Sequence, residues 1–179
     1  MKPFWTEIRK TLFLAVPMII GQLGQMGLHL IDAAMVGRVG VVELASIAFG
    51  GNIVGIFLII GYGLASSVSV LVAQAYGAKN YRRSGEVLKH GIVITFCYAF
   101  AVAALMHSNL GFLNYFGQPD DVVEACKVYV IFLVWSLIPT LAYQCLRTYS
   151  EALNRPWFPF TVLAAGFFLN IFLNWIFIF

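Results

Sequence analysis

Four polar side chains recur along the apolar segment 11–35, namely Gln22, Gln25, His29 and Asp32. Their spacings are three, four and three residues, which at about 100° per residue places them within an arc of roughly 80° on one helical face. An aspartate near the middle of a membrane-spanning helix costs about 2.5–3.5 kcal/mol on insertion scales. We therefore expect this face to be turned toward other helices or toward a water-filled cavity.

Asp32 is the only acidic residue deep within any long apolar segment of the chain. Burial favours the neutral form of a carboxyl group, whereas nearby cations favour the ionised form. The residue type therefore suits a group that holds a proton or, when ionised, binds Na⁺. His29 lies one turn away, and two interpretations of it stay open: it modulates Asp32, or it is a hydrogen-bonded interior histidine.

Asn170 and Asn174 are four residues apart, so on a helix they share a face. Each amide offers donors and acceptors to a neighbouring helix or an oxygen ligand to a cation. Interhelical hydrogen bonding and cation binding are both open interpretations of this pair. On segment 46–74 we interpret Asn52 and the Gly51/Gly55 pair as helix-packing residues.

Pro17 precedes the polar face and removes a backbone hydrogen bond, which predicts a kink or weak point in the first helix. Such a helix could move, and a static kink is the alternative. Three glycines beside the polar face, Gly21, Gly24 and Gly27, predict close approach of another backbone or of a bulky ligand.

The composition indicates a multi-pass integral membrane protein. Of the 179 residues, 61% are hydrophobic and only 11% are charged, and the mean hydropathy is +0.87. Soluble domains are roughly 45–50% apolar and about 25% charged. The sequence has no phosphate-binding GxxxxGK[ST] loop, so any uphill work must draw on an ion gradient or a partner. We expect no cofactor and no nucleic-acid partner.

Five apolar segments predict an all-α transmembrane bundle, organised as a single domain over residues 1–179. The expected helices are residues 11–35, 46–74, 90–107, 125–147 and 158–179. The basic residues of the N-terminal segment and of the loops after the second and fourth helices number nine, against two in the other connectors. This bias predicts a cytoplasmic N-terminus. The loop RTYSEALNRP contains Arg147, and Asp120 or Asp121 is the expected cap of the fourth helix.

The segment LAVPMIIGQLGQMGLHLIDAAMVGRVGVVELASIA resembles the first helix and following loop of multidrug and toxic compound extrusion (MATE) transporters, nearest to the bacterial NorM-type branch. That family has an early proline, a central glutamine and an acid fifteen residues after the proline, here Pro17, Gln25 and Asp32. The segments VAQAYGAKNYRRSGEVLKHG, LRTYSEALNRPWFP and LNIFLNWIF resemble later parts of the same pattern in the same order.

This resemblance implies a secondary antiporter that exports cationic, often aromatic drugs in exchange for H⁺ or Na⁺. It implies two six-helix bundles, so the chain corresponds to part of the N-terminal lobe. The implied proton or cation site is Asp32 with Asn170 and Asn174, supported by Gln25, Pro17 and His29. The implied location is the bacterial inner membrane, and the implied partners are organic cations, the lipid bilayer and a C-terminal lobe supplied by the same gene product or by a second chain.

Three alternatives stay open at this point. The chain could be a truncated, non-transporting membrane fragment or scaffold that needs a second polypeptide, and truncation is the expectation that we favour. An intramembrane enzyme would need a second catalytic group beside Asp32, and only His29 lies within one turn. A passive channel would need a ring of equivalent charges, and a single acid does not supply one.

Overall fold

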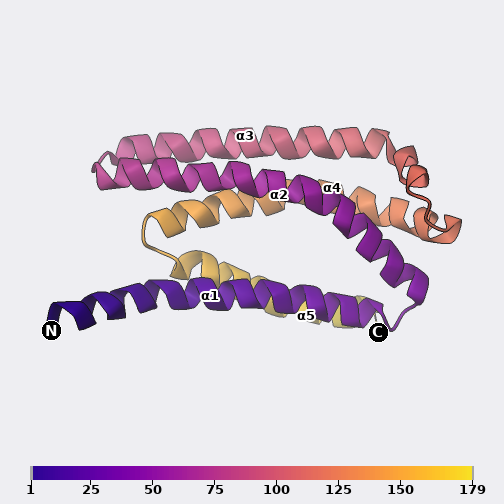
Figure 1. The fold of residues 1–179 in the computed structure, drawn as a ribbon, viewed down its shortest axis with the longest axis horizontal. Coiled ribbons are helices and arrows are strands. Elements are labelled where there is room, and N and C mark those ends of the chain that lie inside the picture. Colours follow the sequence, from indigo (N-terminus) through magenta and orange to yellow (C-terminus); the bar gives the residue numbers. More distant parts are fainter. Residues whose placement is uncertain (1, 179) are drawn as a thin grey trace.

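The computed structural model describes the backbone of residues 2–178 and the side chains of residues 5–9, 11–173 and 175–176. This described part of the chain contains no strand, which confirms the all-α fold class. The described elements are the α-helices α1 Lys2–Val36, α2 Val41–Gly77, α3 Tyr81–Ser108, α4 Asp120–Ala152 and α5 Trp157–Ile178, with the short 3₁₀ helix η1 Leu110–Phe116 between α3 and α4. Figure 1 labels the five α-helices.

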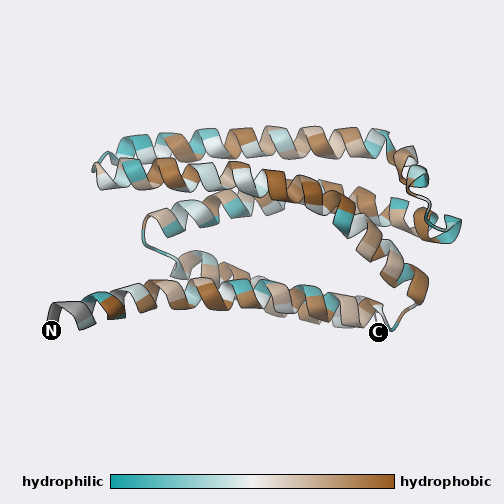
Figure 2. Cartoon of the chain, viewed as in Figure 1, coloured by the Kyte–Doolittle hydropathy of each residue, from teal (hydrophilic) through white to brown (hydrophobic). Residues whose placement is uncertain are grey.

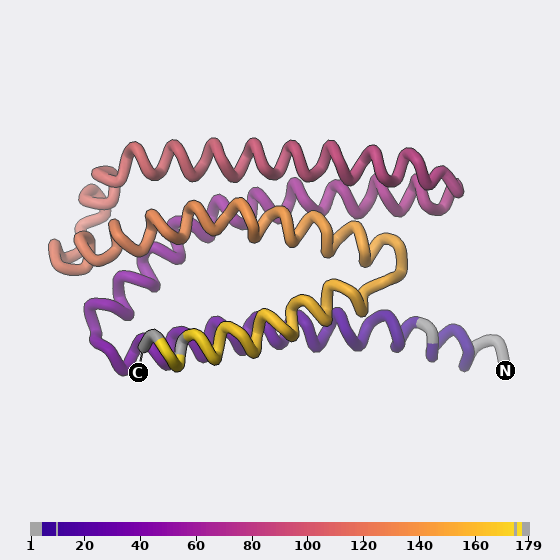
Figure 3. The backbone as a smooth tube through the Cα atoms, turned by 180° about the vertical axis from the view of Figure 1, so that it is seen from behind, coloured from indigo at the N-terminus to yellow at the C-terminus, as the bar shows by residue number. Residues whose placement is uncertain are grey.

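The helices form two groups, which both views of the backbone show (Figures 1 and 3). Helices α2, α3 and α4 pack on one another as a three-helix bundle, and α1 packs mainly on α5. Helices α1 and α5 run parallel, because the Phe13 ring contacts the Trp157 ring and Gly21 faces Leu163 further along. The α1–α5 pair is therefore a layer of its own beside the bundle.

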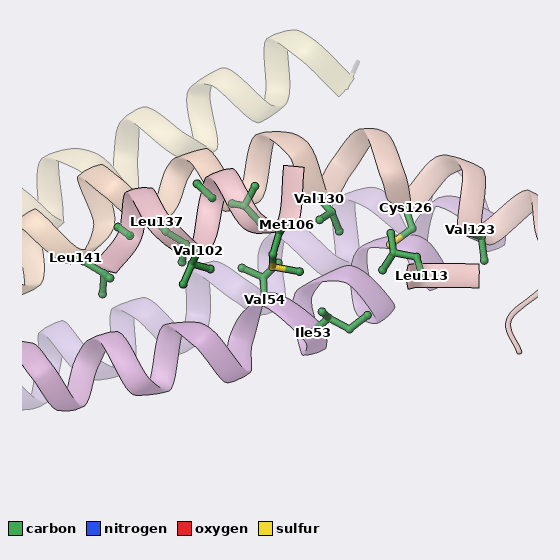
Figure 4. Packing of buried hydrophobic residues seen from close by; sticks show 13 residues of the cluster. Ile53, Val54, Val102, Met106, Leu113, Val123, Cys126, Val130, Leu137 and Leu141 are labelled. Atoms are coloured by element: carbon green, nitrogen blue, oxygen red, sulfur yellow. The ribbon is translucent and has the colours of Figure 1, made fainter. Parts of the chain in front are cut away.

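Small residues set the distances between helices in the bundle. Gly50 and Gly61 of α2 lie against Val130 and Leu141 of α4. Gly91 of α3 lies against Val68 and Cys145 in the same way. The main apolar core is packed beside these approaches, and Figure 4 shows side chains in it such as Val54, Leu113 and Val130. A smaller cluster contains Val68 and Cys145. Close van der Waals packing in the main core holds the three helices and η1 together.

Four of the described helices are long and apolar enough to cross a membrane: Trp5–Val36, Val41–Gly77, Tyr81–Ser108 and Asp120–Ala152. The apolar part of α5 that is described in full, Trp157–Leu173, is shorter. Large apolar side chains such as Leu30, Phe132 and Phe168 are exposed on the outside of these helices. Figure 2 shows hydrophilic residues gathered at the α2–α3 turn and at the connection from η1 to α4.

Helices extend further than the apolar segments predicted. Helix α3 begins at Tyr81 rather than near residue 90, and the Asn80 side chain caps it by accepting a hydrogen bond from the Arg83 N–H at 3.1 Å. Hydropathy detects only the lipid-facing part of a helix, whereas polar residues continue the helical hydrogen bonding beyond it. For the same reason Arg147, expected in a loop, lies inside α4.

The expected aspartate cap of α4 is wrong. Pro119 occupies the capping position and makes no side-chain hydrogen bond to the helix, and Asp120 and Asp121 lie within the first turn. The Asp121 Oδ1 accepts a hydrogen bond from the adjacent Val122 N–H at 2.9 Å. Both carboxylates still lie at the positive end of the helix dipole, where negative charge is favourable.

Candidate functional site

A cavity of about 630 Å³ separates α1 from the three-helix bundle. One wall comes from α1, the other from α2 and α4, and Leu163 of α5 contributes at the edge. Volumes of this size accommodate drug-sized ligands. The lining is largely apolar with a minority of polar groups, which are Gln25, His29, Asp32, Asn52, Tyr62, Tyr129, Ser136 and Thr140.

Three of the four residues on the expected polar face of α1 line this cavity. Gln25 and Asp32 are half-buried, whereas His29 is exposed at the cavity surface. Gln22 is exposed and does not line the cavity, so the prediction for this residue is wrong. Gln22 lies at one edge of the predicted arc. The residues of α1 beyond that edge face away from the cavity.

Asp32 and Tyr129 line the same cavity, one from α1 and the other from α4. Tyr129 was not singled out from the sequence, nor were Ser136 and Thr140. The signal was present, because residues 129, 136 and 140 are seven and four apart and so recur on one face of a helix.

Both residues of the expected asparagine pair lie on α5, and Asn170 does not line the cavity. Asn170 is half-buried, and the side chain of Asn174 lies outside the described residues. Because α1 and α5 are parallel and Gly21 faces Leu163, equal rise along both helices brings the Asn170–Asn174 segment level with the segment of α1 that ends at Asp32.

Pro17 is fully buried within α1, and the helix continues through it. The region around it is closely packed, with a void of only about 10 Å³ bordered by Pro17, Gly21, Tyr143, Arg147 and Pro159. Gly21 makes the predicted close approach, because a β-carbon at this position would lie 3.3 Å from a methyl of Leu163. At Gly24 and Gly27 a β-carbon would meet no neighbour within 4 Å, so these two residues leave space.

The Gly51/Gly55 pair of α2 is not a packing contact. Both residues line the cavity, and a β-carbon at either would meet no atom within 4 Å, whereas Gly50 and Gly61 make the close helix contacts. Asn52 is likewise exposed at the cavity. The Gly51/Gly55 spacing indicates a face of α2 without bulky side chains, but α2 packs on the bundle with a different face.

Arg147 and Glu151 form a partly buried ion pair that was not predicted from the sequence. The Arg147 Nε donates to the Glu151 Oε1 at 2.8 Å, and the Arg147 Nη1 donates to the Gln25 Oε1 at 3.1 Å. A four-residue Arg–Glu spacing on a helix was the available signal. Among the described residues no group of three or more His, Cys, Asp or Glu side chains could hold a metal ion.

The fold and the cavity define a class: a helical membrane protein whose apolar helices line a largely apolar cavity with a carboxylate in its wall. The MatE family model matches residues 17–176, and the chain therefore belongs to the MatE family. The family resemblance found in the sequence is thereby confirmed. Relatives in this family are membrane transporters and not enzymes, and the chain is a multi-pass membrane protein.

The alignments with curated relatives extend over almost the whole chain. It is 30% identical over 175 residues to the probable multidrug resistance protein NorM of Mesorhizobium japonicum, a match of 97% of this chain and 38% of that protein. It is 28% identical over 169 residues to the multidrug and toxin extrusion protein 1 of Xenopus tropicalis, covering 94% of this chain and 29% of that protein. The chain thus spans less than two fifths of the length of these relatives.

Solved structures give the same fold. A multidrug resistance MATE family transporter of the MOP superfamily, described in an outward-facing conformation, superimposes with a TM-score of 0.86 at 20% identity, covering 93% of this chain and 37% of that one. A MOP superfamily transporter from Pyrococcus furiosus gives the same TM-score, identity and coverage. At this identity the likeness establishes the fold.

Proposed function

We propose that the chain is the N-terminal lobe of a secondary antiporter that exports cationic, often aromatic compounds in exchange for H⁺ or Na⁺. The observation that carries the proposal is the position of Asp32, half-buried in the wall of a cavity large enough for a drug-sized molecule. The names of the relatives, which refer to multidrug resistance and to multidrug and toxin extrusion, support the same substrate class.

Exchange of the organic cation for the coupling ion follows from the single negative charge of the Asp32 carboxylate. When ionised, Asp32 stabilises one positive charge in the cavity, which can be a proton on the carboxyl, a bound Na⁺ or an organic cation. Two positive charges at one carboxylate would leave one of them uncompensated in an apolar surrounding, which is costly. Binding of the coupling ion and binding of the organic cation are therefore mutually exclusive, as antiport requires.

The other residues have supporting roles in this proposal. Asn170 and Asn174 are the proposed source of amide oxygens for the site, because oxygen ligands would suit Na⁺. Gln25 and His29 add hydrogen-bonding groups in the same wall, and Pro17 lets α1 bend. Tyr62 and Tyr129 line the cavity and offer aromatic faces that attract organic cations.

We also propose that transport requires a second lobe, supplied by the same gene product or by a second chain, because the relatives are much longer than this chain. Alternating access by rocking needs two bundles that move against each other. The excess of basic residues near the start of α1 and at the helix ends around the α2–α3 and α4–α5 connections supports a cytoplasmic N-terminus. The bacterial relatives support an inner-membrane location.

The test is Asp32→Asn in cells that express the protein from its full natural reading frame. Efflux of ethidium, a planar aromatic cation, is expected to fall to the level of cells without the protein, because the amide cannot ionise. The matched control is Asp120→Asn, which removes one exposed carboxylate outside the cavity and is expected to leave efflux unchanged. Normal efflux by an Asp32→Asn protein that reaches the membrane in normal amount would refute the role of Asp32.

The coupling ion is identified in vesicles by imposing a proton gradient and a Na⁺ gradient separately and recording uptake of the dye. If H⁺ is the coupling ion, only the proton gradient drives exchange. If Na⁺ is the coupling ion, a Na⁺ gradient at equal pH on both sides suffices. Asp32→Asn is expected to abolish whichever response the parent protein gives, and a response that survives the substitution would place the ion elsewhere.

A further inference from the structure

Arg147 is largely buried although its side chain carries a charge. Its side chain is 12% exposed and that of its partner Glu151 is 19% exposed. The chain contains a second Arg–Glu pair at the same spacing, Arg82–Glu86, whose side chains are 91% and 52% exposed. Burying an ion pair is costly unless the remaining donors and acceptors are also satisfied. The comparison indicates that Arg147 is buried for a contact beyond Glu151.

That additional contact is to α1. The Arg147 Nη1 donates to the Gln25 Oε1 at 3.1 Å, while the Nε is used by Glu151. Two different nitrogens of one planar group therefore hold two acceptors at once. A lysine ammonium is a point donor on a flexible stem and does not reproduce this fork. The contact joins residues 122 positions apart in the sequence.

The Arg147–Gln25 contact lies between a closely packed region of the fold and the cavity. On one side lies the closely packed region around Pro17 and Gly21, with its void of about 10 Å³. On the other side lies the cavity of about 630 Å³, which Gln25 also lines. At the packed side the Tyr143 hydroxyl donates to the Pro159 carbonyl at 3.0 Å, so α4 is attached to α5 as well as to α1.

We propose that Arg147 is a positioning residue that holds α1 against α4 and so keeps the cavity closed at its Pro17 end. Glu151 fixes the guanidinium, and the guanidinium holds the Gln25 carbonyl, which leaves the Gln25 amide N–H groups for the cavity. Separation of Gln25 from Arg147 would let α1 move away from α4 at the buried proline and open this end. The identification of the opened space as a transport pathway rests on the function proposed above.

The experiment measures access to Thr140, which lines the cavity two helical turns before Arg147. The protein, expressed from its full reading frame, carries Thr140→Cys in a Cys97→Ala background, because Cys97 is the exposed native cysteine and Cys126 and Cys145 are buried. A membrane-impermeant maleimide is applied to each side of the membrane separately. A cysteine at the exposed Asn154, in the α4–α5 connection, identifies which side that end faces.

Arg147→Gln and Arg147→Lys are each expected to increase labelling of position 140 from the Asn154 side by about tenfold or more, since a hydrogen bond to a charged group is lost. Gln25→Leu is expected to give the same increase with the Arg147–Glu151 pair intact, which covers the case in which the Arg147 variants fail to fold. Gln25→Glu keeps an acceptor for the guanidinium and is expected to stay closed. The matched control, Arg82→Gln, is expected to label like the parent.

Parental labelling in both Arg147→Lys and Gln25→Leu would overturn the proposal, and so would an equal increase in Arg82→Gln. The labelling readout requires no transport, so it is independent of the Asp32→Asn efflux test. Opening of the cavity by the Arg147 variants together with normal efflux by Asp32→Asn would support the closure and refute the proposed ion site. Parental labelling together with efflux lost in Asp32→Asn would refute the closure alone.

Discussion

Gly61 of α2 lies directly against Leu141 of α4, so closely that a β-carbon at position 61 would lie 2.5 Å and 2.7 Å from the two Leu141 methyl carbons. Leu141 is fully buried in the bundle core, so it has little room to move. We expect Gly61→Ala to destabilise the purified protein by about 1–3 kcal/mol through overpacking. The measurement is the midpoint of unfolding in detergent.

The control for this change is Gly63→Ala two residues later, where a β-carbon meets nothing within 4 Å. There the helix propensity of alanine is gained without a clash, so stability should hold or rise by up to about 1 kcal/mol. Equal destabilisation by both substitutions would show that the Gly61–Leu141 contact does not limit the distance between α2 and α4.

Cavity-lining glycines are expected to respond in the opposite way. Gly55→Leu places a side chain in the open cavity, so it should leave unfolding stability unchanged or higher while efflux of a large aromatic cation falls. The measurement pairs thermal unfolding with efflux in cells that express the full reading frame. Gly63→Leu, which enters open space elsewhere on the same helix, is the control and should transport normally. Unimpaired efflux by Gly55→Leu would mean that this cavity is not the substrate route.

The two Arg–Glu pairs should differ in energy because they differ in burial. Glu151→Ala leaves the largely buried Arg147 guanidinium without its carboxylate, and we expect a loss of about 1–3 kcal/mol in unfolding free energy. Glu86→Ala removes an exposed partner, and an effect of at most about 0.5 kcal/mol is expected. Losses of similar size in the two variants would contradict the buried environment of Arg147.

Thr148 provides an interhelical hydrogen bond that can be removed without changing shape. Its hydroxyl is buried and lies 3.2 Å from the Ala65 carbonyl oxygen of α2 and 3.1 Å from the Cys145 carbonyl oxygen of its own helix, so its single proton is shared between the two acceptors. Thr148→Val should lower the unfolding free energy by about 0.5–1.5 kcal/mol. In Thr161→Val the lost bond is to the same helix and exposed, so a smaller effect is expected. The ratio of the two shifts in one denaturation series is the readout, and a ratio near one would contradict the prediction.

Tyr129 is expected to affect cation binding through Asp32. Tyr129→Phe keeps the aromatic ring but removes a hydroxyl from the cavity that Asp32 also lines, so the concentration of dye that gives half-maximal efflux should change several-fold while the amount of protein in the membrane does not. Tyr115→Phe, at a site 90% exposed on η1, is the comparison. An unchanged concentration dependence in Tyr129→Phe would separate Tyr129 from the cation site.

Much of the candidate site could be predicted from the sequence because helical periodicity fixes which residues share a face. The three-, four- and three-residue spacing placed Gln25, His29 and Asp32 together, and all three line the cavity. Insertion cost then excluded lipid as their environment. The order of motifs indicated the family, which the match over residues 17–176 establishes.

Periodicity does not say which helix lies opposite a face or how far away it is. Tertiary packing alone decided that Gly61 contacts Leu141 while Gly55 borders open space, and that Arg147 reaches Gln25 on another helix. Both glycines read alike in the sequence, and Arg147 reads as a loop charge. The sequence by itself determined a membrane bundle with a carboxylate on an inward face. The packing of α1 and α5 beside the bundle determined the cavity, because the space between helices depends on contacts between residues far apart in the chain.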